Sequence, residues 1–344
     1  MTSKYIKARN RCIFLIMFAI CLLFVNFFLV ESKNYYDLAE ATSHFNEFII
    51  TYNKQYRNEV EKFTRFLIFS VNLVEINRKN AESTHAVYGI TLFCDLTYEE
   101  FLKYATGLNG TGDPKCSSSI SQVNSSIIAP DSFDWRTENV VSRVKDQQIC
   151  GSCWAFAATG AVESQYAIKH KTIQEVSEQQ LVDCDQRSSG CGGTNSLDNP
   201  FLYFIENGAM SEKDYPYESK HHTKCRFEKE KVKVTVKGCR NLDVGRDEEK
   251  LKKLLHQNGP TTIALDATPL SKYINGIVKS SECKSKTINH AVLLVGYGTE
   301  NGIPYWIVKN SWGPAWGEDG YVRIERGVNC INMMIAAPVQ PILD

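Results

Sequence analysis

Twelve cysteines constrain the fold of this 344-residue chain more than any other feature, because each disulfide ties together segments that are far apart in the sequence. Cys12 and Cys21 lie in an apolar N-terminal run, and Cys94 and Cys116 lie in the segment that follows. Eight more lie in the C-terminal part: Cys150, Cys153, Cys184, Cys191, Cys225, Cys239, Cys283 and Cys330. Such a set usually forms disulfides in an oxidising compartment, and disulfides are rare in the cytosol. The cysteines therefore predict a protein of the secretory route.

The N-terminus agrees with this route. Four basic residues between Lys4 and Arg11 precede an apolar run from Cys12 to Val30, which is the pattern of a signal peptide. The run is long and no clear cleavage site ends it, and about 18 apolar residues can span a bilayer, so an uncleaved signal anchor is the alternative. Residues 1–32 are therefore predicted to be a signal peptide or signal anchor. The sequons at Asn109 and Asn124 are candidate glycosylation sites on the same route.

The formal charges cancel, with 39 Lys and Arg against 39 Asp and Glu. A nucleic-acid-binding protein needs a basic surplus or patch, so nucleic acid is excluded as a partner. Polybasic membrane-binding segments find no support either, which leaves the N-terminal run as the membrane contact, and only if it stays uncleaved. We expect neither a cofactor nor a metal ion.

Residues 33–108 are rich in helix formers and contain no proline. Six of them follow a helical spacing that places them on one stripe: Glu61, Arg65, Phe69, Asn72, Ile76 and Asn80. An ordinary amphipathic helix explains the two apolar members. The polar members need partners on such a face, so the stripe predicts a specific helix–helix network. A polar stretch from 109 to 124 follows and is predicted to be an exposed linker that is open to proteolysis.

The last segment, residues 129–344, begins helical and ends in strands. Helices are predicted over 154–168 and from a capping box at Ser177. Strands are predicted over 290–297, 305–309 and 321–324, the first two joined by a hairpin at Asn301-Gly302. A helical first half and a strand-rich last third predict an α+β class with two subdomains and a cleft between them.

Cys153 lies where a loop turns into the first of these helices. Unpaired N–H groups and the partial positive charge of a helix N-terminus stabilise a thiolate, which is the nucleophilic form of cysteine. Cys150 and Cys153 also form a C-x-x-C, which permits a redox interpretation of the thioredoxin type. The βαβ context of that fold is missing. If Cys150 pairs with a distant cysteine, Cys153 stays free as a nucleophile.

Among seven histidines, His290 is the best candidate base because it opens a predicted apolar strand, although a histidine there is more often structural. Asn310 lies at the end of the paired strand, where its amide can accept from one ring nitrogen and Trp312 can shield that bond. Gln147, together with the Cys153 backbone N–H, is a candidate donor to an oxyanion.

These residues resemble the papain family of cysteine proteases. The segment Cys150–Trp154 matches C-G-[SA]-C-[WY], with His and Asn roughly 130–150 residues further on. The stripe from Glu61 to Asn80 is similar to the interleaved helix motif of cathepsin L-like propeptides, and the resemblance covers residues from about 37 to 335. Within the family, the stretches 236–239 and 289–298 look closest to the viral cathepsins of baculoviruses. An arthropod or parasite cathepsin L-like protease is the alternative.

The resemblance implies a papain-like fold with a helical half, a β-barrel-like half and an active-site cleft, preceded by an inhibitory propeptide over residues 33–128. It implies Cys153, His290 and Asn310 as catalytic residues and Gln147 at the oxyanion hole. Implied substrate-binding residues are Gly151, Gly193, Ala264, Ile288, Ala291, Trp312 and Ile335, with Ile335 as the floor of an apolar pocket for the residue two before the scissile bond. Trp316 should extend the Trp312 wall. Implied disulfides are Cys150–Cys191, Cys184–Cys225 and Cys283–Cys330, which leave Cys239 as a buried free thiol and give Cys94 and Cys116 no role.

Two positions depart from the family pattern. Gln148 stands where the family has glycine, and it strains the loop that carries Gln147 if φ is positive there. Thr194 replaces the second glycine of Cys-x-Gly-Gly, whose backbone pairs with substrate, which puts binding at this edge in doubt.

The expected function is that of a cathepsin L-like cysteine endopeptidase made as an inactive proenzyme. Protein substrates and its own propeptide are the expected partners, the chain is expected to be a monomer, and acid should loosen the propeptide. The expected location is the secretory lumen, then a lysosome-like compartment or the outside of a host cell. If the viral resemblance holds, the enzyme degrades host tissue late in infection. An inactive homologue that serves as a binding module is the non-enzyme alternative, but it predicts a missing catalytic residue.

Overall fold

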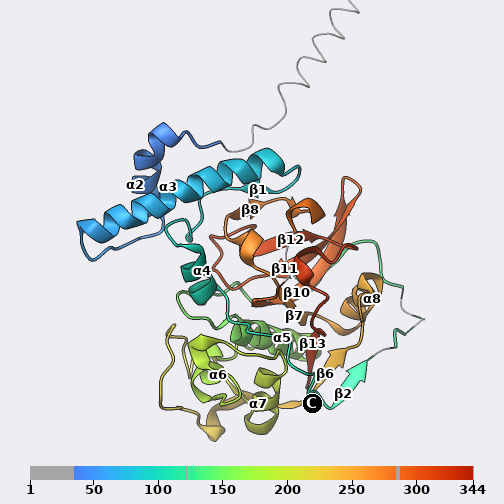
Figure 1. Ribbon diagram of the computed structural model, residues 1–344. Helices are drawn as coiled ribbons and strands as arrows, with labels where there is room; N and C mark the ends of the chain where they lie inside the picture. Colours follow the sequence, from blue (N-terminus) through green and yellow to red (C-terminus); the bar gives the residue numbers. More distant parts are fainter. Residues whose placement is uncertain (1–34, 121, 125, 127, 284–286, 344) are drawn as a thin grey trace, which may run out of the picture. The chain divides into compact units, whose positions relative to one another are not determined.

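The computed structural model describes residues 35–343 apart from 121, 125, 127 and 284–286, so the predicted signal segment at 1–32 lies outside the described residues. Within the described part, none of the helices has the length and apolar character needed to cross a membrane. Figure 1 shows a helical N-terminal segment above a larger body made of helices and one extended sheet.

The N-terminal segment contains one long helix and shorter elements around it. Their bounds are η1 Leu38–Glu40, α2 Ala41–Thr51, α3 Glu59–Glu82, β1 Val87–Tyr88 and α4 Tyr98–Ala105. The Asn58 side chain caps α3 by accepting from the Glu61 N–H, and Thr97 and Glu100 form a capping box on α4. These local signals set where each helix begins.

The polar residues of the predicted stripe have partners. Arg65 makes a two-pronged ion pair with Glu100 of α4 at 2.6 and 2.8 Å. Asn72 donates to the backbone of the loop before α4, and Asn80 exchanges two 2.8 Å bonds with the backbone of Tyr88. The prediction of a helix–helix network holds for the Arg65 pair, whereas the two asparagines bind loop and strand backbone.

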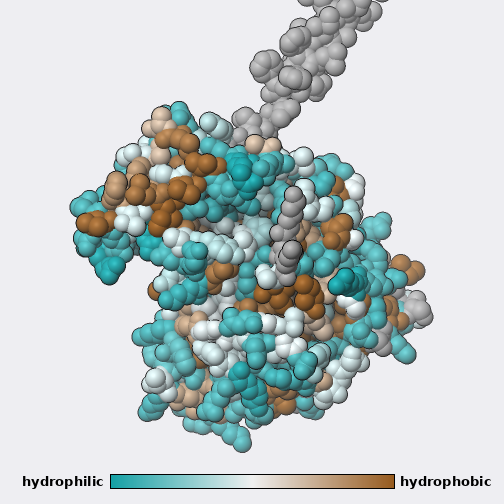
Figure 2. All heavy atoms as spheres, viewed as in Figure 1, coloured by the Kyte–Doolittle hydropathy of each residue, from teal (hydrophilic) through white to brown (hydrophobic). Residues whose placement is uncertain are grey.

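A second apolar stripe runs along α3 on its outer side. Its exposed members are spaced three and four residues apart: Val60, Phe63, Leu67, Val71 and Val74. Figure 2 shows apolar side chains gathered at this end of the molecule. The inner face, with Phe69, Leu73 and Ile76, is buried in the larger of two core clusters and is therefore the face that docks the segment.

The larger body divides into a helical part and a sheet. The helices are α5 Cys153–His170, α6 Glu178–Cys184, η2 Gly190–Gly192 and α7 Asn199–Asn207, followed later by η3 Lys229–Lys231, α8 Glu248–Asn258, η4 Thr268–Leu270, η5 Ser280–Glu282 and η6 Cys330–Asn332. The strands are β2 Ser118–Ile120, β3 Phe133–Asp134, β4 Ala209–Met210, β5 Val232–Val234, β6 Val236–Leu242, β7 Thr261–Leu265, β8 Tyr273–Asn275, β9 Ile277–Val278, β10 His290–Glu300, β11 Ile303–Lys309, β12 Tyr321–Glu325 and β13 Val339–Leu343. The predicted helix at 154–168 and the three predicted strands are confirmed to within a few residues.

Nine strands form the main sheet in the order β2-β6-β13-β7-β10-β11-β12-β9, with β3 added beside β10. The path is open, because β2 and β9 end it with one neighbour each. The expected β-barrel-like half is therefore not a closed barrel. The β10–β11 hairpin turns at Asn301 and Gly302, both with positive φ, as a tight hairpin turn requires.

Helix α5 lies against β10, β7 and β13 and is buried on nearly all sides. Gly160 lets the strand approach, since a Cβ there would lie 3.2 Å from the Leu293 side chain. Because α5 begins at Cys153 and β10 begins at His290, this packing brings the two residues from separate halves together.

Four disulfides are present among the described residues. Three are those that the resemblance implies: Cys150–Cys191, Cys184–Cys225 and Cys283–Cys330. The fourth joins Cys116 to Cys239, so the prediction of a free Cys239 is wrong. The two cysteines are 123 residues apart in sequence, and only the pairing of β2 beside β6 brings them together.

Candidate active site

Cys153 occupies the first position of α5 and is fully buried. Its Sγ accepts the backbone N–H of Ala291 at 3.4 Å, which fixes the thiol beside the start of β10. The thiol is one of two free cysteines in the described residues, the other being Cys94. Because Cys150 is tied to Cys191, the redox interpretation of C-x-x-C is excluded.

His290 is held by Asn310 across the β10–β11 hairpin. The two side chains meet at 2.8 Å between Nε2 and Oδ1. Asn310 Oδ1 also accepts the Ser311 N–H, so it is the oxygen and Nε2 must carry the proton. Nδ1 is then the acceptor nitrogen, and it has no partner among the described residues. The Trp312 ring stacks on the imidazole at 5.0 Å between centroids and shields the bond to Asn310.

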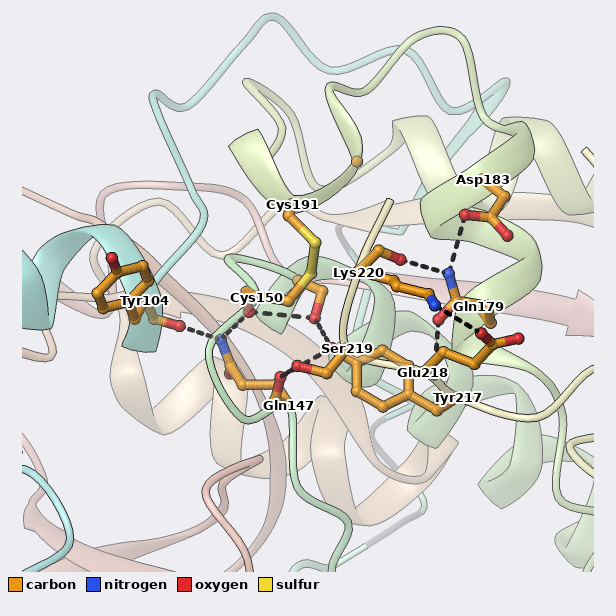
Figure 3. The surroundings of a disulfide bond; sticks show 12 residues. Tyr104, Gln147, Cys150, Gln179, Asp183, Cys191, Tyr217, Glu218, Ser219 and Lys220 are labelled. Atoms are coloured by element: carbon orange, nitrogen blue, oxygen red, sulfur yellow. Dashed lines mark hydrogen bonds and ion pairs between the residues drawn. A yellow bond between two sulfur atoms is a disulfide. The ribbon is translucent and has the colours of Figure 1, made fainter. Parts of the chain in front are cut away.

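Gln147 is buried and anchored to the same loop. Its Oε1 accepts from Ser311 Oγ at 2.6 Å and its backbone N–H donates to the Ser311 carbonyl at 2.8 Å. Because Oε1 is held by Ser311, the Gln147 amide has a fixed orientation and its Nε2 is free to donate. Figure 3 shows Nε2 facing the Tyr104 carbonyl, and it also donates to the Thr106 and Cys150 carbonyls. The end of α4 thus occupies the donor predicted for an oxyanion.

The chain after α4 runs between Asn289, just before β10, and Thr194 of the helical part. The N–H groups of Gly107 and Leu108 donate to the Asn289 carbonyl at 3.1 and 2.9 Å. Thr194 donates to the Gly107 carbonyl and accepts from the Asn109 N–H. Gly107 allows the closest approach, because a Cβ there would lie 2.2 Å from the Gly151 carbonyl oxygen. The segment thus bonds to Asn289 on one side and to Thr194 on the other, and Leu108 shares an apolar cluster with Cys153.

The model of the papain family of cysteine proteases matches residues 129–339, and that of the cathepsin propeptide inhibitor domain (I29) matches residues 45–101. A viral cathepsin of Spodoptera exigua nuclear polyhedrosis virus is 43% identical over 302 residues, which cover 87% of this chain and 88% of the relative. The chain belongs to the papain family of cysteine proteases. The structure of digestive procathepsin L 3 from Tenebrio molitor larval midgut is 37% identical, with a TM-score of 0.79, and covers 88% of this chain and 99% of that one. A viral cathepsin of Orgyia pseudotsugata multicapsid polyhedrosis virus is 44% identical over 299 residues, or 86% of this chain and 90% of the relative.

This papain-family chain is a cathepsin L-like zymogen: a cysteine peptidase with an intramolecular propeptide inhibitor. The propeptide and the disulfides make it a secretory protein that acts on protein substrates. In this proenzyme, burial raises the pKa of the Cys153 thiol to about 12 and lowers the pKa of His290 to about 4. Hydrogen bonds to the sulfur oppose the first shift and the Asn310 bond opposes the second, but desolvation dominates both. The pair is therefore neutral in the proenzyme.

The residues predicted to form an apolar substrate pocket lie in two groups. Ala264 and Ala291 lie opposite each other across β7 and β10, and Ile288 packs on the same cluster. Leu108, from the segment after α4, is buried in that cluster too. Ile335 does not join this apolar cluster. Its side chain is 45% exposed and lines a separate cavity, together with Thr111, Gly112 and Pro114.

Trp312 and Trp316 form an aromatic corner with ring centroids 4.7 Å apart. Phe93 and Phe101 of the propeptide pack edge-on against Trp312, whose Nε1 donates to the Ala105 carbonyl at 2.8 Å. The wall predicted for substrate is thus covered by the propeptide.

The two departures from the family pattern have different outcomes. Gln148 has φ of 53°, so a side chain sits in a conformation that favours glycine and the predicted strain is present. Thr194 keeps the strand pairing with both its N–H and its carbonyl, because its side chain turns inward to bond Ser188 and Asn199. The Thr194 backbone therefore pairs with residues 107–109 of this chain despite the side chain.

The exposed linker was predicted to begin at residue 109, but residues 107–109 are hydrogen-bonded to Asn289 and Thr194. The signal for it is weak: Gly107 and Leu108 form a short stretch with no helical or strand period. Asn109 is exposed, but its N–H donates to Thr194 and its Nδ2 donates to the Gly192 carbonyl at 2.8 Å, so this sequon lies on the cleft rim rather than in a free linker.

Proposed function

We propose that Cys153 is the nucleophile, His290 the acid and base, Asn310 the residue that orients it, and Gln147 the oxyanion donor of this endopeptidase. The observation that carries the proposal is the contact of Cys153 Sγ with the start of β10 while His290 is fixed through Nε2. The other ring nitrogen of His290, Nδ1, remains available. His290 is also the chain neighbour of Ala291, whose N–H donates to the Cys153 sulfur. No alternative pair of nucleophile and base shares these features among the described residues.

The reaction follows from these groups once the propeptide has left. Nδ1 takes the Cys153 proton, and the thiolate attacks the peptide carbonyl carbon while the oxyanion accepts from Gln147 Nε2 and the Cys153 N–H. The imidazolium then protonates the leaving amine as the C–N bond breaks, which leaves a thioester. His290 next removes a proton from water, whose oxygen attacks the thioester and frees the acid and the thiol.

Residues 33–128 are proposed as the inhibitory region and 129–344 as the catalytic domain. The inhibitory region is held partly by carboxylate ion pairs such as Arg65–Glu100. The Arg65 guanidinium lowers the pKa of the Glu100 carboxyl below its ordinary value of 4.5. Because its pKa is lowered in the folded state, the Glu100 carboxylate stabilises the fold fully when the pH is above 4.5. This stabilisation is lost as the pH falls below 4.5 and through the lowered pKa. Acid is therefore the proposed trigger.

An apolar residue is the proposed preference two positions before the scissile bond, because Ala264, Ala291 and Ile288 belong to the same apolar cluster as Leu108. These side chains include no carboxylate, so arginine at that position would be buried without a partner. The test is a set of fluorogenic dipeptides that differ only at this position. A rate for arginine equal to that for leucine would exclude the assignment.

A virus-encoded cathepsin that degrades host proteins late in infection is the proposed setting, supported by 43% identity to a viral cathepsin. The enzyme is proposed to act as a monomer and to carry glycans at Asn109 and Asn124, both exposed. Its route is the secretory lumen and then an acidic compartment or the medium of the dying host cell.

The catalytic assignment is tested on the secreted precursor after acid processing. Cys153→Ala is expected to abolish peptide hydrolysis and labelling by an epoxide that alkylates active thiolates. Asn310→Ala should retain labelling at a rate lowered by about 10–100-fold, because the ring loses its orienting partner. The matched control is Cys94→Ala, whose thiol is buried in the propeptide and should not matter. Labelling in the Cys153→Ala protein would refute the assignment.

A further inference from the structure

The disulfide between Cys116 and Cys239 joins the segment before the protease domain to the protease domain itself. Cys116 lies beyond the propeptide inhibitor match at 45–101 and before the protease match at 129–339, whereas Cys239 lies within the protease match on β6. The bond is therefore a covalent connection from the activation linker to the catalytic domain. Neither family match assigns it.

The residues around Cys116 are built into the catalytic domain. Strand β2 pairs in parallel with β6 as the last strand of the main sheet, with Ser118 opposite Arg240 and Ile120 opposite Leu242. Ser118 Oγ donates to the Cys239 carbonyl at 3.1 Å, and the Asp243 N–H donates to the Ile120 carbonyl at 3.0 Å. These bonds hold the strand on the C-terminal side of the disulfide.

A buried carboxylate holds the chain on the N-terminal side of the disulfide. Asp198 is 2% exposed, and one of its oxygens accepts the backbone N–H groups of both Lys115 and Cys116. Its second oxygen accepts from the Asn241 amide at 3.0 Å. The Lys115 ammonium donates to the side chain of Asn199 at 3.2 Å. Residues 115–120 are thus fixed to the catalytic domain by a disulfide, a strand pairing and a buried charge.

Exposed chain lies on both sides of this fixed segment. Residues 111–115 are exposed, and Ile128 is 87% exposed on the other side. Exposed irregular chain is where proteases cut. A cut before Cys116 separates the helical propeptide from the catalytic domain, whereas a cut after residue 120 leaves the two linked through sulfur.

We propose that the Cys116–Cys239 disulfide keeps the propeptide covalently attached after the linker is cut on the C-terminal side of Cys116. The propeptide then leaves only after a second cut before Cys116 or after a thiol reduces the bond. The proposal rests on the proposed inhibitory role of residues 33–128. Residues 115–120 lie within that proposed inhibitory region, but they stay attached to the catalytic domain after the first cut, on whichever side of Cys116 it falls.

The tether matters because it turns inhibition into an intramolecular event. A short flexible link gives an effective concentration of about 1 mM, so an inhibitor segment with a dissociation constant of about 1 µM stays bound roughly 99.9% of the time. Without the disulfide, the same cut fragment diffuses away on dilution. The position of the cut therefore decides whether processing produces an open or a closed enzyme.

Reduction is a two-electron thiol–disulfide exchange with a small thiol of the glutathione or dithiothreitol class. Its thiolate attacks the Cys116 sulfur, which is partly exposed, and Cys239 leaves as a thiolate and takes a proton. A second thiol group attacks the mixed disulfide, which frees the Cys116 thiol and leaves the reductant as a disulfide. Two protein thiols and one oxidised reductant are the products.

The test uses two full-length precursors that differ only in where one recognition sequence for a site-specific protease is inserted. One carries it between Asp113 and Pro114 and the other between Ile128 and Ala129. Both carry Cys153→Ala, so that the enzyme cannot cut itself. After complete cutting without reductant, the first should release its propeptide on a non-reducing denaturing gel and the second should run as one species. Reductant should separate the second. Two separate chains from the second precursor without reductant would overturn the proposal.

The matched control is C116S/C239S in the second precursor, which should release the propeptide without reductant. Secretion and a cooperative melting transition show that this variant folds. If it does not fold, the position of the disulfide is read by mass spectrometry of the cut Cys153→Ala protein, and a free Cys239 thiol there overturns the proposal. Epoxide labelling in versions that retain Cys153 tests the proposed function separately: absence of labelling in the form cut before Cys116 refutes that function, while the gel still decides the tether.

Discussion

Removal of the propeptide is expected to change the ionisation of Cys153 as well as its access to solvent. In the proenzyme the thiol is fully buried in a cluster that includes Leu108, and burial raises its pKa to about 12. With that pKa, only about one thiol in 10⁵ is ionised at pH 7. His290, with a pKa lowered to about 4 for the same reason, is neutral above that pH. The proenzyme therefore lacks the charged pair that attack on a carbonyl requires.

Opening the cleft readmits water to both groups and reverses the cause of both shifts. The N-terminus of α5 and a protonated His290 then favour the thiolate, as in other catalytic cysteines at helix starts. We expect the thiolate to dominate at pH 5–7. At pH 6, we expect the processed enzyme to react at least about 10³-fold faster than the proenzyme. Even an ordinary free thiol, with a pKa of about 8.5, is roughly 10³-fold more ionised than the buried Cys153 thiol.

The assay is alkylation by iodoacetamide between pH 4 and pH 9, followed by mass spectrometry of the Cys153 peptide. The proenzyme should react slowly, with a rate that rises tenfold for each pH unit across the whole range. The processed enzyme should react at a nearly constant rate from pH 5 to pH 8. Cys94→Ala removes the other free thiol of the described residues. Equal rates for the two forms at pH 6 would refute the claim that burial suppresses the ion pair.

Other substitutions test single contacts. Gly107→Ala should raise epoxide labelling of the uncut precursor by about tenfold or more, because the added Cβ would lie 2.2 Å from the Gly151 carbonyl oxygen. Gln148→Gly should stabilise the processed enzyme by about 1 kcal/mol in thermal unfolding, since a non-glycine residue pays that cost at φ of 53°. Thr194→Val should lower stability by about 1–2 kcal/mol through lost hydroxyl bonds. It should leave KM unchanged if substrate pairs with the Thr194 backbone as residues 107–109 do. Glu100→Gln should move the midpoint of acid processing to higher pH, since the carboxylate with its lowered pKa no longer stabilises the propeptide above pH 4.5.

The features that form between neighbours along the chain could be predicted before the fold was known. Cys153 could be placed at a helix start because the helical pattern begins there, and α5 does begin there. His290 and Asn310 could be paired because the Asn301-Gly302 turn sets the register of the two strands that carry them. Turn chemistry and helix periodicity act over a few residues, so they are readable from the chain alone.

Tertiary structure decided which distant segments meet. The spacing of the cysteines along the chain does not determine which of them pair. Cys116 meets Cys239 because β2 is the edge strand beside β6. The burial of Leu108 among side chains of β7 and β10 likewise depends on where the propeptide crosses the sheet. The protonation of Cys153 follows from the same crossing, because desolvation is a property of everything packed around the sulfur and of no single motif.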